Sequence, residues 1–344
     1  MKDNENKTSE YQYLLDMADR LWLQDKFEEA LEILDEIPHD CKEYSTSLYM
    51  KSMIMGMRGD KENSFNAFKE FIFEEFGPDF VDMDEEYKPI DMNDPEELFY
   101  CGLTEFYIFN DYESAIKYFD LSLKLNDNQN EVLRYKALSY AYSGKLKKAI
   151  KTIDVLIKID SDNPAYWNDK GMILSQLNHI SKAHKAFDKA IEIEPASIPW
   201  TNKGILYYRV DNFDEALECF KKAIKLDSSD IEAIVSLAGL YSKLEDYDAA
   251  ERYFEMAEKV DEGNIVYLVE RGKHLLNQNQ FKKSIEYFDR ALEIDNELAD
   301  VLMYKSMALS EMGMDCESEV CFKRAIDLDP DSINIFDEVL IIEE

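Results

Sequence analysis

A period of 34 residues runs through most of this 344-residue chain and constrains its fold more than any other feature. Alignment on one small residue in each copy gives nine repeats, and seven of the eight steps between them are 34 or 33 residues. The repeats start at Tyr11, Ser45, Glu96, Asn130, Pro164, Ser197, Ile231, Ile265 and Ala299. Stacked helical hairpins repeat at this length, because each hairpin is too thin to bury its own apolar face. The sequence therefore predicts an all-α solenoid.

Three positions of each repeat predict how the helices pack. The twentieth position is small in every copy: Ala30, Ser64, Ala115, Ala149, Ala183, Ala216, Ala250, Ser284 and Ser318. Four residues later, on the same helix face, the residue is always large: Leu34, Phe68, Phe119, Ile153, Phe187, Phe220, Phe254, Phe288 and Phe322. The eighth position is small in eight copies, and Leu103 is the exception. Small residues at these points allow the two helices of a hairpin to approach closely.

This pattern resembles the tetratricopeptide repeat from about Tyr11 to Pro330. The matching features are the period, the aromatic fourth position in Trp167 and Trp200, the small eighth and twentieth positions, and the closing prolines Pro195 and Pro330. The closing proline is missing from most copies. The resemblance implies a right-handed α-solenoid of helix-turn-helix hairpins. It also implies a non-enzymatic scaffold or adaptor that binds an extended peptide or helix in a concave groove.

In proteins of this kind the first helix of each hairpin lines the groove, so the resemblance assigns the groove to particular positions. The predicted groove residues are Tyr100, Tyr107, Arg134, Tyr135, Tyr142, Asn168, Met172, Asn202, Tyr208 and Arg209. Tyrosine, methionine and arginine are enriched at protein interfaces. A long aromatic side chain is also able to pack between adjacent repeats, so we expect about half of these residues to be accessible.

The charge of the chain narrows the choice of partner. Lys and Arg total 39 against 73 Asp and Glu, which gives a formal charge of -34. Such a field repels phosphate backbones and anionic lipids, so we expect neither nucleic acid nor membrane as a partner. The two-carboxylate clamp of the family's chaperone-binding members is not present, since Arg134 is followed by Leu138 and then Asp169. We expect an apolar or basic protein or peptide; alternatively, the acidity only keeps the chain soluble.

The sequence contains no catalytic or metal-binding motif, so we predict no enzymatic activity and no cofactor. The four histidines, His39, His179, His184 and His274, lack zinc-ligand spacing. An alternative function is a regulatory or substrate-recruiting subunit that acts in trans on an enzyme. The polar N-terminus and five cysteines without CxxC spacing favour a cytoplasmic location with reduced thiols.

Three segments fall outside the regular repeats. Residues 1–10 are expected to be a flexible lead, and residues 77–95 an acidic insertion between the second and third repeats. Long loops are often functional, but a surface insertion is also tolerated at small entropic cost. Residues 333–344 are expected to form a capping helix. The apolar stripe of Ile335 and Ile342 either supports weak self-association through this helix or belongs to the cap of a monomer.

Overall fold

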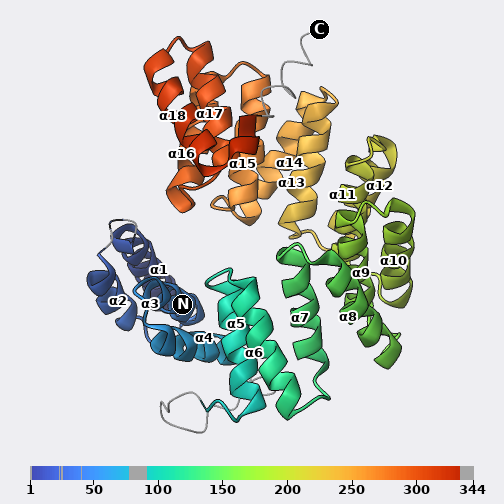
Figure 1. The fold of residues 1–344 in the computed structure, drawn as a ribbon. Helices are drawn as coiled ribbons and strands as arrows, with labels where there is room; N and C mark the ends of the chain where they lie inside the picture. The colour runs from blue at the N-terminus through green and yellow to red at the C-terminus, as the bar shows by residue number, and fades with distance from the viewer. Residues whose placement is uncertain (1, 23, 25, 40, 77–90, 334–344) are drawn as a thin grey trace. The chain divides into compact units, whose positions relative to one another are not determined.

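The structure is a computed structural model that describes residues 2–22, 24, 26–39, 41–76 and 91–333 (Figure 1). Within these residues the chain forms eighteen α-helices and one short 3-10 helix, and none of them is in a strand. The chain divides into two compact units, Met1–Asn178 and His179–Glu344. The predicted all-α solenoid is confirmed, since each unit is built from stacked helical hairpins.

Unit 1 contains the first nine helices. They are α1 (Lys2–Trp22), α2 (Phe27–Asp35), α3 (Tyr44–Met57), α4 (Lys61–Phe76), α5 (Pro95–Tyr107), α6 (Tyr112–Leu125), α7 (Asn130–Tyr142), α8 (Leu146–Ile159) and α9 (Pro164–Gln176). Helices α1 to α8 pair as four hairpins, and the second helix of each hairpin also contacts the first helix of the next. Asp94 and Asn163 cap α5 and α9, and a proline follows each at the first helical position.

Unit 2 contains the remaining helices. They are α10 (Ile180–Ile193), α11 (Ser197–Tyr208), α12 (Phe213–Leu226), α13 (Ile231–Lys243), α14 (Tyr247–Val260), α15 (Ile265–Asn277), α16 (Phe281–Ile294), α17 (Ala299–Glu311), α18 (Asp315–Leu328) and the 3-10 helix η1 (Pro330–Ile333). Helices α11 to α18 pair as four hairpins, and η1 contacts α17 and α18.

Small residues face large ones inside the hairpins. A β-carbon on Gly204 would lie 2.6 Å from Cε1 of the buried Phe220, so no larger residue fits there without movement of the ring. Where the small residue of the second helix is serine, it also bonds to the first helix. The Ser284 hydroxyl donates to the Gly272 carbonyl at 2.9 Å, and Ser318 donates to the Ser306 carbonyl at 2.8 Å. The small columns of the sequence thus mark the point where the two helices cross.

The third repeat differs from the expected alignment by one residue. Gly102, not Leu103, packs against the Phe119 ring, as Gly204 packs against Phe220. The extra residue lies in the turn, because the Asp111 amide reaches back six residues to the Glu105 carbonyl, whereas the equivalent Gln280 amide reaches back five to Leu275. The apparent exception at Leu103 is therefore a longer turn and not a large residue at the crossing point.

From α3 onward, each turn between an odd-numbered helix and the next helix contains one residue in the left-handed region of backbone space. These residues are Gly59, Asn110, Gly144, Asn178, Asp211, Glu245, Asn279 and Gly313. Glycine adopts this conformation without strain and asparagine adopts it more easily than most residues. Glu245, at φ 61°, has neither property.

A ladder of ion pairs joins successive hairpins within each unit. A lysine of a first helix contacts an aspartate of the preceding second helix, fifteen or sixteen residues earlier in the chain. The pairs are Lys51 with Asp35, Lys136 with Asp120, Lys170 with Asp154, Lys203 with Asp188, and Lys305 with Asp289. The lysines are largely covered and the aspartates more exposed, so each pair contributes up to ~1 kcal/mol.

The three irregular segments are only partly described. Residues 2–10 belong to α1, and their expected flexibility stays a prediction. Residues 77–90 of the insertion lie outside the described residues, which resume at Asp91 before the cap of α5. The capping helix falls almost wholly on residues 334–344, which also lie outside them. The functional role of the insertion and self-association through the C-terminal helix both stay predictions.

Candidate functional site

The predicted groove residues belong to the first helices of the hairpins, and neighbouring first helices contact one another within each unit. In unit 1, α7 contacts both α5 and α9; in unit 2, α11, α13, α15 and α17 form a continuous series. We call the solvent-facing side of each series its first-helix face. Each unit therefore has a first-helix face of its own.

An aromatic cluster occupies the first-helix face of unit 1. The Phe106 ring is surrounded by four tyrosines, Tyr107, Tyr112, Tyr135 and Tyr142, with ring centroids 4.9, 5.4, 5.8 and 5.6 Å away. All four meet Phe106 edge to face, an arrangement that aromatic quadrupoles favour. We call these five residues the tyrosine cluster.

The rim of the tyrosine cluster is open to solvent. Tyr107 is 44% exposed and Tyr142 is 52% exposed, although both are large aromatic residues. Tyr142 stacks on Tyr112 at 5.2 Å, and the Tyr107 hydroxyl donates to the Tyr135 oxygen at 3.1 Å. Burial of its ring and this hydrogen bond both raise the pKa of Tyr107, so its hydroxyl stays protonated at physiological pH.

Beside the cluster lies an ion pair between α7 and α9. Arg134 donates through Nε to the Asp169 carboxylate at 2.7 Å and lies 3.9 Å from Glu131. Asp169 is almost completely buried, and burial raises its pKa while the bond to Arg134 opposes the rise. Arg134 is thus committed within unit 1, because removing it would leave a buried carboxylate without its partner.

The remaining predicted groove residues of unit 1 are less accessible. Tyr100 is 3% exposed and belongs to the core between α4, α5 and α6, and Asn168 is 8% exposed. Met172 is half-buried beside Asn168. Of the predicted residues in this unit, Tyr107, Tyr135 and Tyr142 come together in one cluster, while Tyr100 lies beneath the surface.

The first-helix face of unit 2 presents cations over aromatic rings. Lys243 of α13 lies over the Tyr208 ring at 5.1 Å and over Phe213 at 5.2 Å. Lys273 of α15 lies over Tyr304 of α17 at 5.4 Å and pairs with Glu270 at 2.7 Å. Burial alone would lower the pKa of Lys273, but Glu270 raises it, so the ammonium stays charged. Cation–π contacts of this kind are strongest where water is excluded.

Asn202 and Arg209 complete the predicted set in unit 2. Asn202 is half-buried on α11, and Arg209, which ends this helix, is exposed. Tyr208 is half-buried, and burial raises its pKa. The structure thus brings Tyr208 together with Lys243 and Phe213, a combination that was not in the predicted set.

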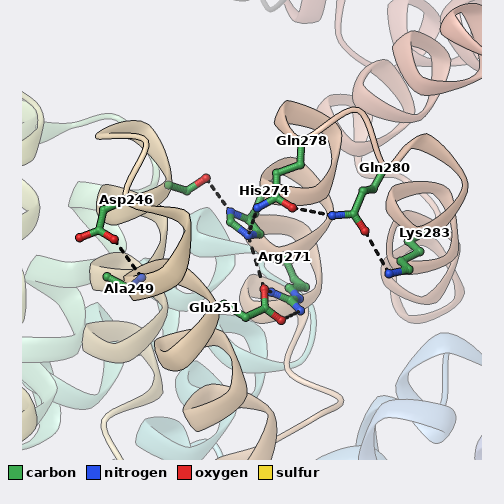
Figure 2. Close-up of polar contacts among 9 residues, drawn as sticks. Asp246, Ala249, Glu251, Arg271, His274, Gln278, Gln280 and Lys283 are labelled. Atoms are coloured by element: carbon green, nitrogen blue, oxygen red, sulfur yellow. Dashed lines mark hydrogen bonds and ion pairs between the residues drawn. The ribbon is translucent and has the colours of Figure 1, made fainter.

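A second polar site lies between α14, α15 and α16 (Figure 2). It is an open pocket of about 450 Å³ lined by Tyr247, Asp248, Glu251, Arg271, Leu275, Gln278, Gln280, Lys283 and Tyr287. Arg271 donates through both terminal nitrogens to both Glu251 oxygens, at 2.6 and 2.5 Å. In the ion-pair ladder the cation on the first helix is always a lysine, whereas here it is Arg271.

The buried His274 lies next to the lining residue Gln278, within a directed chain of hydrogen bonds. Lys283 donates to Gln280 at 3.0 Å, Gln280 donates to Gln278 at 2.5 Å, and the Gln278 amide lies 3.0 Å from His274 Nε2. Nδ1 of His274 then lies 2.8 Å from the Ser242 hydroxyl. The chain fits a neutral imidazole that accepts at Nε2 and donates at Nδ1. Burial and the nearby Arg271 both lower the pKa of His274, which favours this neutral form.

No cluster of metal-binding type is found in the described residues, and none of their helices is long and apolar enough to span a membrane. The cysteines are free thiols. Burial raises the pKa of Cys101 to about 12 and that of Cys219 to about 11, so both thiols are protonated and unreactive at neutral pH.

The sequence prediction missed the ladder, Phe106 and the α14–α16 site. The ladder has a signal, because Asp and Lys recur fifteen or sixteen residues apart at matching places in the repeats. His274 also has one: it follows Gly272 by two residues, where Leu206 and Leu240 follow the small residues Gly204 and Ala238. Within unit 2 the other residues of this column, Leu206, Leu240 and Ala308, are apolar, so the histidine marks the odd interface of that unit.

The family comparisons agree with the hairpin geometry. Three family models, each described as tetratricopeptide repeat, match residues 164–197, 198–230 and 235–299. The human protein named Tetratricopeptide repeat protein 13 is 28% identical over 120 residues. This match covers 35% of the chain and only 14% of the human protein.

Solved structures of helical repeat proteins have a similar fold. A tetratricopeptide repeat protein from Parabacteroides merdae is 18% identical with a TM-score of 0.56, over 77% of this chain and 98% of that chain. The yeast Tom70 structure is 14% identical with a TM-score of 0.54, over 98% and 97%. The APC/C hetero-tetramer Cut9-Hcn1 is 14% identical with a TM-score of 0.55, over 95% and 76%. At these identities the likeness shows the fold alone.

Proposed function

We propose that this chain, which is a tetratricopeptide repeat protein, is a non-enzymatic scaffold that binds an extended peptide or helix on its first-helix faces. Proteins built from this repeat are in general interaction scaffolds. The proposal adds where the partner binds and what kind of partner it is.

The observation that carries the proposal is the exposure of aromatic side chains at the ends of α5 and α7. Tyr107 and Tyr142 are 44% and 52% exposed, and they extend an aromatic cluster whose other members are buried or half-buried. Exposing such rings costs free energy in the unbound protein, which binding would recover by burying them. Rings that are already held by Phe106 also lose little freedom on binding.

Charge supports an apolar or basic partner. The formal charge of -34 would speed the approach of a basic segment and slow that of an acidic one. Near the tyrosine cluster, Arg134 is already paired with Asp169. The first-helix face of unit 2 has Lys243 and Lys273, but the charge of Lys273 is balanced by its ion pair with Glu270. On the described part of either face, an acidic ligand therefore meets cations that are already engaged with this chain's own groups.

Affinity purification with mass spectrometry tests the proposal. The bait is the full chain in four forms: wild type, Tyr107→Ala with Tyr142→Ala, Tyr208→Ala with Lys243→Ala, and the control Tyr13→Ala. Tyr13 is 61% exposed on α1 and lies outside the tyrosine cluster. We expect partners that bind wild type and the control but are lost from at least one double variant of normal helical content. Equal recovery by all four baits would contradict binding on these faces.

The same experiment addresses the alternative role. If the recovered partner is an enzyme whose rate changes when the chain is added, the chain acts in trans as a regulatory or substrate-recruiting subunit. A partner without enzymatic activity would support the scaffold role and not the regulatory one.

A further inference from the structure

We propose that the tyrosine cluster of unit 1 binds a proline-rich segment in the polyproline II conformation, with basic rather than acidic flanking residues. This inference rests on the proposed function and names the partner class for one of its two faces. It is carried by the ring geometry, the hydroxyl groups and the position of the cluster in the repeat.

The two exposed rings are close enough together to contact a single turn of a polyproline helix. Tyr107 and Tyr142 have centroids 4.9 and 5.6 Å from that of Phe106. Their centroids therefore lie at most about 11 Å apart, and one turn of a polyproline II helix is ~9 Å long. Prolines one turn apart on the same side of the ligand would each pack against one exposed tyrosine. The edge-to-face contacts with Phe106 hold the two rings in place before the ligand arrives.

The Tyr135 hydroxyl supplies a hydrogen-bond donor at the edge of these rings. The Tyr135 oxygen accepts the Tyr107 proton at 3.1 Å, and its own proton has no acceptor in the part of the chain that the structure describes. That proton is available to a ligand carbonyl. Tyr112 already donates to the Asn110 side chain at 3.2 Å, so it offers its ring for packing and no proton for a hydrogen bond.

This donor discriminates between ligand conformations. A polyproline II segment makes no internal hydrogen bonds, so all of its carbonyl groups accept bonds from outside. An α-helix satisfies its own carbonyls except in the last turn, and could use only the rings of the cluster. A β-strand requires a sheet edge, and no described residue is in a strand. Aromatic surfaces edged with donors are the general solution for binding proline-rich segments.

The position of the tyrosines within the repeat points to a role outside the fold. Tyr107 and Tyr142 each lie five residues after the small residue of the crossing point, Gly102 and Ala137. The residues at the same place in unit 2 are Arg209, Lys243, Asn277 and Glu311. Stacking of the hairpins therefore does not require an aromatic residue at this place. The two tyrosines belong to consecutive hairpins, and their first helices, α5 and α7, contact each other.

The charge near the cluster selects the flanking residues of the ligand. Arg134 is held by Asp169 and Glu131, so it offers no free charge to a carboxylate. The net charge of the chain attracts arginine or lysine beside the prolines and repels glutamate. We therefore expect a basic proline-rich peptide to bind more tightly than its acidic counterpart.

Fluorescence anisotropy with the full chain and three labelled peptides tests the inference. The first peptide repeats the unit Pro-Pro-Arg three times, the second replaces each arginine with glutamate, and the third is an alanine- and leucine-rich helix with the same number of arginines. We expect the first to bind tightest, and Tyr142→Ala to weaken it about tenfold, as for a central interface residue. Tyr135→Phe keeps the ring but removes the hydroxyl, both the proton offered to the ligand and the oxygen that accepts from Tyr107, and should weaken binding about threefold. Tyr208→Ala in unit 2 should leave binding unchanged.

The outcomes separate this inference from the proposed function. Tighter binding of the helical peptide that is also lost in Tyr142→Ala overturns the polyproline ligand but retains the first-helix face as a binding surface. A second result would also overturn the polyproline ligand but retain the binding surface. In that result none of the three peptides binds, while the affinity purification finds a partner that wild type recovers and the Tyr107→Ala, Tyr142→Ala bait does not. Binding of the proline peptide that is insensitive to Tyr142→Ala overturns the site. Circular dichroism of each variant shows that the fold is intact.

Discussion

The first helices of unit 1 and unit 2 differ in the type of residue at their C-terminal ends. Among the described residues of unit 1, those five places after the crossing point are Met57, Tyr107, Tyr142 and Gln176. The first three are exposed apolar or aromatic side chains, and only Gln176, at the end of α9, is polar. In unit 2 the equivalent residues are Arg209, Lys243, Asn277 and Glu311, all polar or charged. The crossing point itself is the same in both units, with a glycine against a phenylalanine.

The difference separates what the fold requires from what it leaves open. A cation near the C-terminal end of a helix is favoured by the helix dipole, so Lys243 and Arg209 stabilise their own helices. The dipole gives no such advantage to tyrosine at the same place. The helix dipole therefore gives no reason for the aromatic ends of α5 and α7, in agreement with the binding role proposed above. Substitutions in the shared core and at the differing positions test this contrast between the units.

The largest effect is expected at the shared core. Phe119→Ala in unit 1 and Phe288→Ala in unit 2 each remove a completely buried ring, and each should lower the free energy of unfolding by ~3–5 kcal/mol. Urea titrations followed by circular dichroism measure this, with Val320→Ala, 67% exposed on α18, as the control. A large loss in one unit and a small loss in the other would show that the cores differ as well as the surfaces.

A smaller effect is expected at Glu105, one of the buried acids of unit 1. Glu105 is 5% exposed and accepts a bond from Lys61 at 2.6 Å, whereas the equivalent Leu275 of unit 2 is apolar. Lys61→Met should lower the free energy of unfolding by ~1–2 kcal/mol, because the carboxylate then lacks its partner. Glu105→Leu should be neutral or stabilising. The same urea titration compares them, and a loss as large in Glu105→Leu as in Lys61→Met would mean that the pair itself stabilises unit 1.

The counterpart in unit 2 is the histidine under the α14–α16 site. The pKa of His274 is lowered in the folded protein, so its ordinary value of 6.5 applies to the unfolded chain. The stability from neutral His274 is thus fully present above pH 6.5 and is lost as the pH falls from there toward the folded pKa. His274→Leu should cost ~1–2 kcal/mol at pH 7, because Ser242 and Gln278 lose a partner, and should reduce this pH dependence.

Melting temperatures of wild type and His274→Leu between pH 5 and pH 8 measure this difference. His184 also has a pKa lowered by burial, so His184→Gln is the matched control within the same unit. Parallel curves for wild type and His274→Leu would mean that the hydrogen-bond chain does not respond to pH.

The smallest effect concerns the turns. Glu245 of unit 2 has a φ of 61°, where Gly144 of unit 1 has a φ of 74°. Glu245→Asn should raise the free energy of unfolding by ~0.5 kcal/mol, because asparagine tolerates this conformation better. Gly144→Ala should lower it by ~1 kcal/mol, although a β-carbon there meets no atom within 4 Å. Opposite signs in the urea midpoints are the expected result.

Much of the fold was predictable because packing repeats itself in the sequence. The small twentieth position of Ala216 and the large Phe220 specify a helix crossing without knowledge of the structure. The extra residue before Asp111 was not predictable, since an insertion in a turn leaves both helix patterns intact. The alignment of the repeats counted this extra residue before the crossing point instead of in the turn after it, which made Leu103 the apparent exception.

The binding face was less predictable than the fold. Tyr100 and Tyr135 were both assigned to the groove, but Tyr100 is buried and Tyr135 is half-buried in the tyrosine cluster. Position within a helix decides which way a side chain points, whereas its exposure depends on the size of its neighbours. Lys243 over Tyr208 joins residues of two different repeats, and no single-repeat pattern reports such a contact.

The ion-pair ladder also has a mechanical consequence in unit 2. In most hairpins a lysine of the first helix pairs with an aspartate of the preceding hairpin. Helix α13 has Leu237 at the place of Lys203 in α11, so it lacks this ion pair. There Lys221 of α12 lies over the Tyr241 ring instead. Apolar packing resists separation only over short distances, whereas an ion pair attracts over a longer range. We therefore expect that, when a force pulls unit 2 apart, α12 and α13 separate before the interfaces that an ion pair joins.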